Sequence, residues 1–212
     1  MQIPVARPAI GQDEISAVTA VLESGMLASG ERVAEFERNF ADYCGSTHAV
    51  AINNGTAALH AALLAADIGQ GDEVIVPSFT FFATASAVSM TGAKPVFADV
   101  HERTFNIDPA QVENAVTPRT KAVIGVHLFG QPVDLDPILK IANNRSIPVI
   151  EDACQAHLAE WKGKMVGNWG LCGCFSFQAS KNLNCGDGGA LLTNSDEWAD
   201  KCYSFHNQCR PR

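Results

Sequence analysis

The sequence predicts an α/β protein in which helices cover a mostly parallel β-sheet. Short apolar runs alternate with helical segments from about residue 48 onward, the pattern of strands joined by crossover helices. Neither an internal repeat nor a low-complexity linker interrupts this alternation. Hydrophobic residues make up 47% of the 212-residue chain, so a sizeable core is expected.

Two helices are expected before the sheet, at 13–24 and near 31–42. Four apolar residues of the first helix share one face: Ile15, Val18, Val21 and Leu22. The alternating part predicts strands at 48–52, 73–77, 95–98, 122–126, 147–151, 173–177 and 189–193. It predicts helices at 56–66, 80–90, 109–115, 134–144 and 195–204. No Gly-x-Gly-x-x-Gly follows the first strand, which argues against a dinucleotide-binding domain.

One lysine, Lys181, follows the apolar, strand-like run that contains Phe175 and Phe177 and precedes the Gly-rich turn 186–189. A lysine attacks a carbonyl only where burial or a neighbouring cation lowers its pKa and frees the lone pair. The buried strand and a turn that lets backbone approach a flat ligand favour that situation. Lys181 is therefore a candidate Schiff-base nucleophile, and the alternative is a solvated lysine at the start of a surface loop.

A second apolar run, from Ile147, ends in two carboxylates, Glu151 and Asp152. At the carboxyl end of a parallel strand, such a group faces the crevice where open α/β sheets bind ligands. There it could hold the pyridinium nitrogen of pyridoxal phosphate, which makes that cofactor an electron sink. We rank Asp152 first and Glu151 second for this role. Gln155, one helical turn on, could hydrogen-bond the ring oxygen.

A third element combines the strand at 49–52, a turn at 53–56 and a helix over 57–66. Free backbone N–H groups and the helix dipole make such a turn an anion site, and the Thr56 hydroxyl adds a donor. A phosphate group would fit there. The alternative is that Asn54 or Thr56 simply caps the helix.

Together the three elements resemble the DegT/DnrJ/EryC1/StrS family of sugar aminotransferases, which have the aspartate-aminotransferase-like fold of pyridoxal phosphate enzymes. The resemblance runs nearly end to end, through motifs at 3–8, 24–27, 54–59, 76–81, 94–100, 106–109, 126–132, 151–157 and around Lys181. It implies a three-layer α/β/α large domain with a mostly parallel central sheet and pyridoxal 5'-phosphate as cofactor.

The resemblance also assigns roles. It implies that Lys181 forms the internal aldimine, that Asp152 holds the pyridine nitrogen and that Gln155 contacts the ring oxygen. Phe81 matches the aromatic residue that stacks on the cofactor ring. The phosphate cup is matched by Gly55, Thr56 and Ser176. Two further residues, His127 and Gln178, match positions near the cofactor. Without the family, Phe81 would be interpreted as a core aromatic and His127 as a satisfied core histidine.

The implied reaction is a transamination in two halves, from glutamate to a nucleotide-linked keto-deoxysugar, in amino-sugar or surface-polysaccharide biosynthesis. Lys181 would act first as nucleophile and then as general acid and base. Relatives that remove a sugar hydroxyl carry histidine in place of the lysine, so Lys181 favours transamination. The alternatives are a non-catalytic, pyridoxal-phosphate-binding regulatory protein and an inactive truncated fragment.

The resemblance predicts a domain division. Residues 1–25 are expected to be an N-terminal segment that packs with a C-terminal small domain, and residues 26–212 an incomplete large domain. Family members continue much further, so the chain is expected to lack that small domain. A homodimer is expected for the full-length protein.

Fifteen basic and twenty-three acidic residues give a net charge of −8, which argues against nucleic-acid and anionic-membrane partners. No apolar run is long enough to span a bilayer, and the N-terminus lacks the features of a signal peptide, so a cytoplasmic location is expected. An anionic sugar nucleotide would still need local positive charge. Arg32, Lys162 and Lys164 are candidates, and solvated surface charge is the alternative.

Seven cysteines show no spacing typical of a disulfide framework, so reduced thiols are expected. Cys172, Cys174, Cys185 and His127 are candidate zinc ligands, but no Cys-x-x-Cys pair supports a zinc site. No metal is therefore expected. Cys185, beside the lysine loop, is expected to be sensitive to oxidation.

Overall fold

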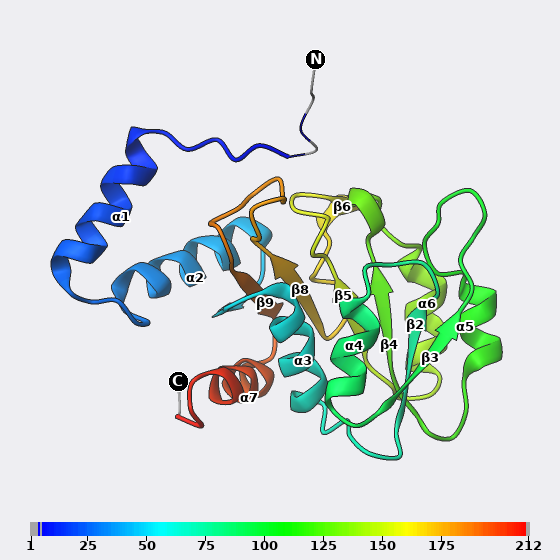
Figure 1. Ribbon diagram of the computed structural model, residues 1–212. Coiled ribbons are helices and arrows are strands. Elements are labelled where there is room, and N and C mark those ends of the chain that lie inside the picture. The colour runs from blue at the N-terminus through cyan, green and yellow to red at the C-terminus, as the bar shows by residue number, and fades with distance from the viewer. Residues whose placement is uncertain (1–3, 5, 211–212) are drawn as a thin grey trace.

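A seven-stranded sheet forms the centre of the computed structural model, which describes residues 4 and 6–210 (Figure 1). Its strands are β1 (His48–Ile52), β2 (Glu73–Pro77), β3 (Lys94–Ala98), β4 (Thr120–Val126), β5 (Val149–Asp152), β8 (Cys172–Ser176) and β9 (Gly189–Thr193). Their order is β1-β9-β8-β5-β4-β2-β3. Strand β9 runs antiparallel to both neighbours, and the other pairings are parallel. The expected mostly parallel sheet is confirmed.

Helices cover both faces of this sheet. One face carries α3 (Gly55–Ala65), α4 (Ala83–Met90) and α7 (Asp196–His206), and α3 and α4 lie in front of the sheet in Figure 1. The other face carries α2 (Glu31–Cys44), α5 (Pro109–Ala115) and α6 (Leu135–Asn143). The three-layer α/β/α architecture follows from this division.

Strand periodicity explains why both layers can be apolar. Successive side chains of a strand point to opposite faces, so Ile150 packs in the cluster under α3 and α4, whereas Val149 packs in the cluster under α5 and α6. Likewise Leu191 and Leu192 of β9 enter different clusters. A residue's position along β5 therefore decides which side of the sheet its side chain reaches.

The sequence predictions differ from the structure mainly at element ends. Strand β5 covers 149–152 rather than 147–151, so Asp152 lies inside the strand, and α4 begins at Ala83 rather than at residue 80. The small hairpin of β6 (Glu160–Trp161) and β7 (Lys164–Met165) was not predicted, nor was the 3-10 turn η1 (Leu128–Gly130). Two-residue strands are too short to show an alternating pattern.

Helix α1 (Gln12–Ser24) projects away from the other elements (Figure 1). None of its residues is buried, and Ile15, Val18 and Leu22 of the predicted apolar face are 52%, 59% and 62% exposed. Val21 is half-buried, so most of that face, but not all of it, is left uncovered by the described residues. Of the expected N-terminal segment 1–25, residues 1–3 and 5 lie outside the described residues.

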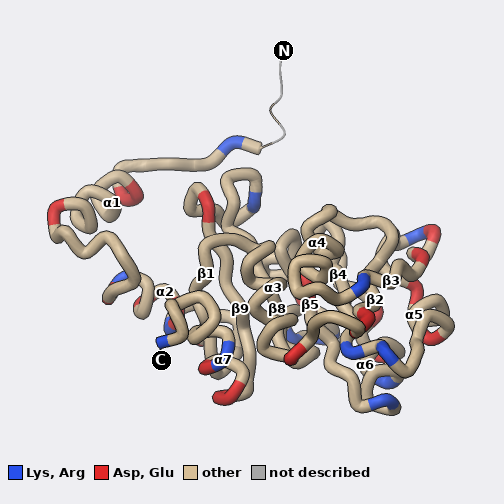
Figure 2. Tube along the Cα trace, turned by 60° about the horizontal axis from the view of Figure 1, so that its bottom comes forward, with Lys and Arg blue, Asp and Glu red and all other residues tan. Residues whose placement is uncertain are grey.

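Charged residues are spread over the fold. In Figure 2 basic and acidic positions are interspersed along the trace rather than separated into one basic stripe. Within the described part of the chain, we find no helix with the length and apolar character needed to cross a membrane.

Candidate active site

A cavity of about 880 Å³ opens beside the carboxyl ends of β5 and β8, between the first turn of α3, the segment before α4 and the Lys181 loop. Most of the residues proposed from the sequence meet there. The lining includes Gly55, Thr56, Phe81, Asp152, Gln155, Ser176, Gln178 and Lys181. Residues from distant parts of the sequence thus share one cavity, as expected at this edge of a parallel sheet.

Asp152 presents its carboxylate to the cavity and is only 6% exposed. Its Oδ2 accepts a hydrogen bond from the Thr84 hydroxyl at 2.8 Å, and its Oδ1 accepts one from the backbone N–H of Cys154 at 3.2 Å. Each carboxylate oxygen retains capacity for another donor. The carboxylate can therefore receive a hydrogen bond from a group inside the cavity.

Glu151, its neighbour on β5, points to the opposite side of the sheet and is fully buried. Its carboxylate accepts hydrogen bonds at 2.7 Å from the backbone N–H groups of Gly167, Trp169 and Gly170. Glu151 does not line the cavity. Of the two carboxylates at the end of β5, Asp152, ranked first from the sequence, is the one in position to meet a cavity ligand.

His127 also lies on the Glu151 side, and its side chain is fully buried. Its Nδ1 accepts the backbone N–H of Val133 at 3.1 Å, so the ring proton resides on Nε2, which donates to Glu151 at 3.0 Å. His127 does not line the cavity. The structure gives it the bonds of a satisfied core histidine rather than a position beside a ligand.

The first turn of α3 supplies hydrogen-bond donors. Asn54 caps the helix by accepting from Ala57 N–H at 2.8 Å. Among the described residues, none accepts a hydrogen bond from the backbone N–H of Gly55 or Thr56. Thr56 and Ser176, each with a hydroxyl, also line the cavity. Capping and anion binding are thus compatible, because they use different N–H groups.

Gly55 is needed for the close approach of α3 to β8. A Cβ atom at this position would lie 2.6 Å from the Cys154 sulfur and 2.8 Å from the Ser176 Cβ. Both distances are shorter than van der Waals contact. Glycine therefore lets the N-terminus of α3 pack directly against Ser176, which also lines the cavity.

Gln155 has a defined carboxamide orientation. Its Oε1 accepts the backbone N–H of Phe129 at 2.9 Å. Phe129 itself lies in the left-handed region, with φ of 53°. Because the oxygen is used in this way, the amide NH₂ is the part of Gln155 that remains available as a donor.

The loop that carries Lys181 is held by Gln178. The Gln178 Oε1 accepts from the Ser180 N–H at 2.8 Å and from the Ser180 hydroxyl at 2.6 Å, and the Gln178 carbonyl accepts from Lys181 N–H at 2.8 Å. Gln178 lines the cavity as well. Its side chain thus shapes the turn that brings Lys181 to the cavity.

Phe81 is a cavity residue rather than a core residue. It is 58% exposed, and its ring centroid lies 4.6 Å from that of Phe82. An exposed aromatic face at a cavity offers a surface on which a planar ring can stack. The structure therefore disfavours the core interpretation of Phe81.

Some cavity residues were not singled out from the sequence. Cys154 lines the cavity, and burial, followed by the nearby Asp152 charge, raises the pKa of its thiol well above 9.0. His60 lines it too, and burial lowers its pKa from 6.5. Thr84 lies behind the cavity. The four-residue spacing of Thr80 and Thr84 was a signal that could have drawn attention to this pair.

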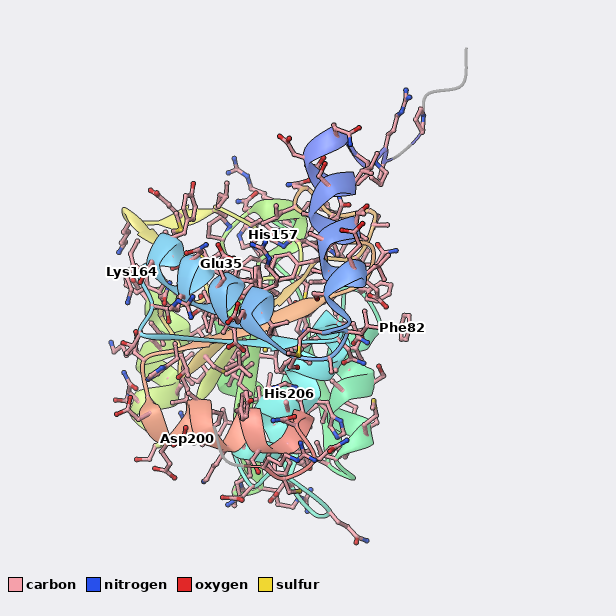
Figure 3. The ribbon with its side chains drawn as sticks, turned by 90° about the vertical axis from the view of Figure 1, so that its left-hand side faces the viewer. Glu35, Phe82, His157, Lys164, Asp200 and His206 are labelled. Atoms are coloured by element: carbon pink, nitrogen blue, oxygen red, sulfur yellow. The ribbon has the colours of Figure 1, made fainter. Side chains whose placement is uncertain are left out.

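The three basic residues considered for a sugar nucleotide do not line the cavity. Arg32 pairs with Glu35 at 3.0 Å, Lys162 pairs with Asp136, and the Lys164 ammonium donates to the Asn168 carbonyl at 2.7 Å. In Figure 3, Lys164 lies on the opposite side of the ribbon from Phe82, the neighbour of Phe81. These positions agree with the alternative that the three residues are solvated surface charges.

No group of three or more His, Cys, Asp or Glu side chains in the described residues could hold a metal ion. Every cysteine is a free thiol. Cys185 is exposed, but partial burial of its sulfur and the Asp187 charge raise its pKa above 9.0. Since the thiolate is the reactive form, this shift opposes the predicted oxidation sensitivity of Cys185.

The cavity fits pyridoxal phosphate. Unpaired N–H groups and two hydroxyls suit a phosphate group, Phe81 suits a planar ring, and the Asp152 carboxylate suits a protonated ring nitrogen. The available NH₂ of Gln155 suits a ring oxygen, and Lys181 brings an amine for an aldehyde. The donor set thus matches each end of this cofactor.

Comparisons with known proteins identify the family to which this chain is similar. The model of the DegT/DnrJ/EryC1/StrS aminotransferase family matches residues 8–212. The chain is 51% identical over 199 residues to the spore coat polysaccharide biosynthesis protein SpsC of Bacillus subtilis, covering 94% of this chain and 51% of that protein. It is 48% identical over 208 residues to the GDP-perosamine synthase of Caulobacter vibrioides, covering 98% of this chain and 56% of that protein.

Among solved structures, Spr1654 from Streptococcus pneumoniae in its PLP-form superposes with a TM-score of 0.92 at 30% identity, covering 96% of this chain and 57% of that one. A PMP-form of the same protein gives the same TM-score. The chain spans about half the length of the curated relatives it matches.

Proposed function

Because the chain belongs to the DegT/DnrJ/EryC1/StrS aminotransferase family, whose members depend on pyridoxal phosphate, we propose that it forms the cofactor-binding domain of a sugar aminotransferase. The amino donor is glutamate, and the acceptor is a nucleotide-linked keto-deoxysugar. The names of two relatives support a role in polysaccharide or amino-sugar biosynthesis. The observation that carries the proposal is the presence of Lys181 and Asp152 in one cavity.

In this proposal the first turn of α3 and β8 bind the phosphate. The backbone N–H groups of Gly55 and Thr56, with the hydroxyls of Thr56 and Ser176, donate to its oxygens. Their convergence depends on the close helix–strand approach at Gly55. These groups fix one end of the cofactor.

At the other end, three side chains orient the ring. Phe81 stacks on its face, the Asp152 carboxylate accepts the ring N–H, and Gln155 donates its NH₂ to the ring oxygen. Pyridoxal phosphate, when bound, supplies an electron sink for negative charge at the donor's α-carbon. Asp152 maintains that property by keeping the ring nitrogen protonated.

Lys181 anchors the cofactor through its amine and afterwards moves a proton. Its position on a turn fixed by Gln178 keeps Nζ at the cavity, where the amine can take a proton from the donor's α-carbon and return it. His127 has no direct part in this proposal, because its nitrogens bind Val133 and Glu151. Gln178 acts by shaping the lysine turn.

The domain and assembly assignments remain proposals as well. Residues 1–25 pack against a C-terminal small domain of a longer protein, which the exposed apolar face of α1 supports. The longer protein is a cytoplasmic homodimer, and it binds neither nucleic acid nor membrane. Light scattering of the longer protein in solution tests this assembly, and the measured mass should be twice that of one chain.

The first test is the visible absorbance spectrum of the purified chain with added pyridoxal phosphate, before and after glutamate. Borohydride reduction and peptide mapping then locate any covalent attachment. We expect a reducible attachment at Lys181 in the wild-type chain and none in Lys181→Ala, with loss of the visible band on adding glutamate. A cofactor adduct retained in Lys181→Ala would reject the assignment.

The same experiment separates the alternatives. A bound cofactor whose spectrum does not respond to glutamate would favour a regulatory, non-catalytic protein. A folded, monodisperse chain that takes up no cofactor would identify an inactive fragment.

A further inference from the structure

Thr84, which the proposed function leaves without a role, connects α4 to Asp152. It is the second residue of α4, its exposure is 0%, and it lies outside the cavity lining. Its hydroxyl reaches across to β5 and bonds Asp152 Oδ2 at 2.8 Å. The contact joins residues 68 positions apart.

The direction of this hydrogen bond is fixed by chemistry. An ionised carboxylate only accepts, so Thr84 donates its single hydroxyl proton to Asp152. The Thr80 hydroxyl lies 3.1 Å from the Thr84 oxygen, and it must then donate to Thr84. A one-way chain of hydroxyls therefore runs from Thr80 through Thr84 to Asp152.

This chain fixes the plane of the Asp152 carboxylate. Thr84 holds Oδ2, and the Cys154 N–H holds Oδ1 at 3.2 Å. With one protein donor on each oxygen, rotation about the last side-chain bond would break both hydrogen bonds. The remaining acceptor capacity of the carboxylate is thus held toward the cavity.

We propose that Thr84 is a positioning residue, whose hydroxyl holds the Asp152 carboxylate in the orientation that receives the ring N–H of pyridoxal phosphate. This inference rests on the proposed function. The same short segment carries Phe81 between the two threonines, so one piece of chain offers the stacking face and orients the carboxylate. Hydrogen bonds to charged groups are stronger than neutral ones, and they contribute more when buried.

The test compares two ligands in matched variants. Equilibrium binding is measured with pyridoxal phosphate and with an analogue in which CH replaces the ring nitrogen, for the wild-type chain, Thr84→Val and Thr84→Ser. Val keeps the shape of Thr without the hydroxyl, and Ser keeps the hydroxyl. We expect Thr84→Val to weaken binding of pyridoxal phosphate about tenfold and Thr84→Ser to stay within about threefold of wild type.

The analogue distinguishes positioning from a general structural effect. If Thr84 acts through Asp152 and the ring nitrogen, Thr84→Val and wild type bind the CH analogue equally well. Equal affinity of Thr84→Val and wild type for pyridoxal phosphate would overturn the inference, and so would the same loss for both ligands. Thr84→Ala, which adds no bulk, replaces Thr84→Val if the latter fails to fold.

Failure of the proposed function gives a different result. A wild-type chain that binds neither ligand would reject cofactor binding itself. A wild-type chain that binds pyridoxal phosphate covalently at Lys181, with Thr84→Val unchanged, would reject only the role of Thr84.

Discussion

The two carboxylates at the end of β5 are neighbours in sequence but belong to different environments. Glu151 is enclosed by the turn 167–170 and His127, and its oxygens hold protein donors only. Asp152 has one protein donor on each oxygen and faces a cavity. Strand alternation thus places one carboxylate among the groups that stabilise the fold and the other where it can bind a ligand.

Removing the Glu151 side chain is expected to have the largest effect on stability. Glu151→Ala leaves three backbone N–H groups, one buried and two partly buried, and the buried His127 without their acceptor, so the free energy of unfolding should fall by about 3–5 kcal/mol. Urea unfolding measures this change. Asp152→Ala is the matched control; it removes the acceptor of two protein donors rather than four, so the expected loss is about 1 kcal/mol. A Glu151→Ala chain as stable as the control would contradict the structural role of Glu151.

Asp152→Asn is expected to lower the reaction rate strongly and the stability of the fold little. The amide keeps the volume of the side chain but loses the charge that holds a proton on the ring nitrogen, so the glutamate half-reaction should slow about a hundredfold or more. Stopped-flow absorbance measures this rate. Some cofactor should still bind, through the phosphate contacts and Lys181.

The control for this charge change is Asp200→Asn, on the exposed surface of α7 and far from His157 in Figure 3. Its rate should equal that of wild type. A near-normal rate in Asp152→Asn would remove the proton-holding role from Asp152.

The sequence could predict much of this site and ranked Asp152 before Glu151, but it could not show which face of the sheet each carboxylate occupies. A register shift of one residue exchanges the faces of Glu151 and Asp152. The predicted strand, 147–151, ended one residue before Asp152, which is the last residue of β5 in the structure. The Lys181 stretch and the turn before α3 carry local signals, namely an apolar run followed by glycines and a helix start. Those signals need no tertiary information.

Other features depend on contacts that local sequence does not encode. The bond of Thr84 to Asp152 joins α4 to β5, and the bonds of Glu151 to the turn 167–170 span at least sixteen residues. The same limit explains His127, whose partners Glu151 and Val133 appear only in the fold.

The buried histidines are expected to have a smaller effect, on the pH dependence of stability. His127 has both nitrogens bonded, whereas Nε2 of His60, His157 and His206 has no partner among the described residues. Burial lowers the pKa of these three histidines from 6.5. The unfolded chain therefore binds more protons, so their contribution to stability is complete above about pH 6.5 and is lost as pH falls through the lowered values.

The melting temperature should accordingly drop by a few degrees between pH 7.5 and pH 5.5. His157 packs against Phe175 and Phe177, with ring centroids 5.9 and 5.4 Å away, so His157→Phe preserves an aromatic ring there. This variant should lose less stability on acidification than wild type. A melting temperature that rises toward pH 5.5 would contradict the sign of the shift.

Lys164→Ala is expected to have the smallest effect. It should lower the stability of the turn that Glu151 holds and leave cofactor binding unchanged. The ammonium donates to the carbonyl of Asn168, inside the turn that Glu151 holds, and lies 5.1 Å from the ring centroid of Trp169. Losing one such contact should lower the free energy of unfolding by about 1 kcal/mol or less. Cofactor affinity should not change, because the carboxylate that faces the cavity has no bond to this turn. A weaker affinity for pyridoxal phosphate in Lys164→Ala, measured by titration, would mean that the two faces of β5 are coupled.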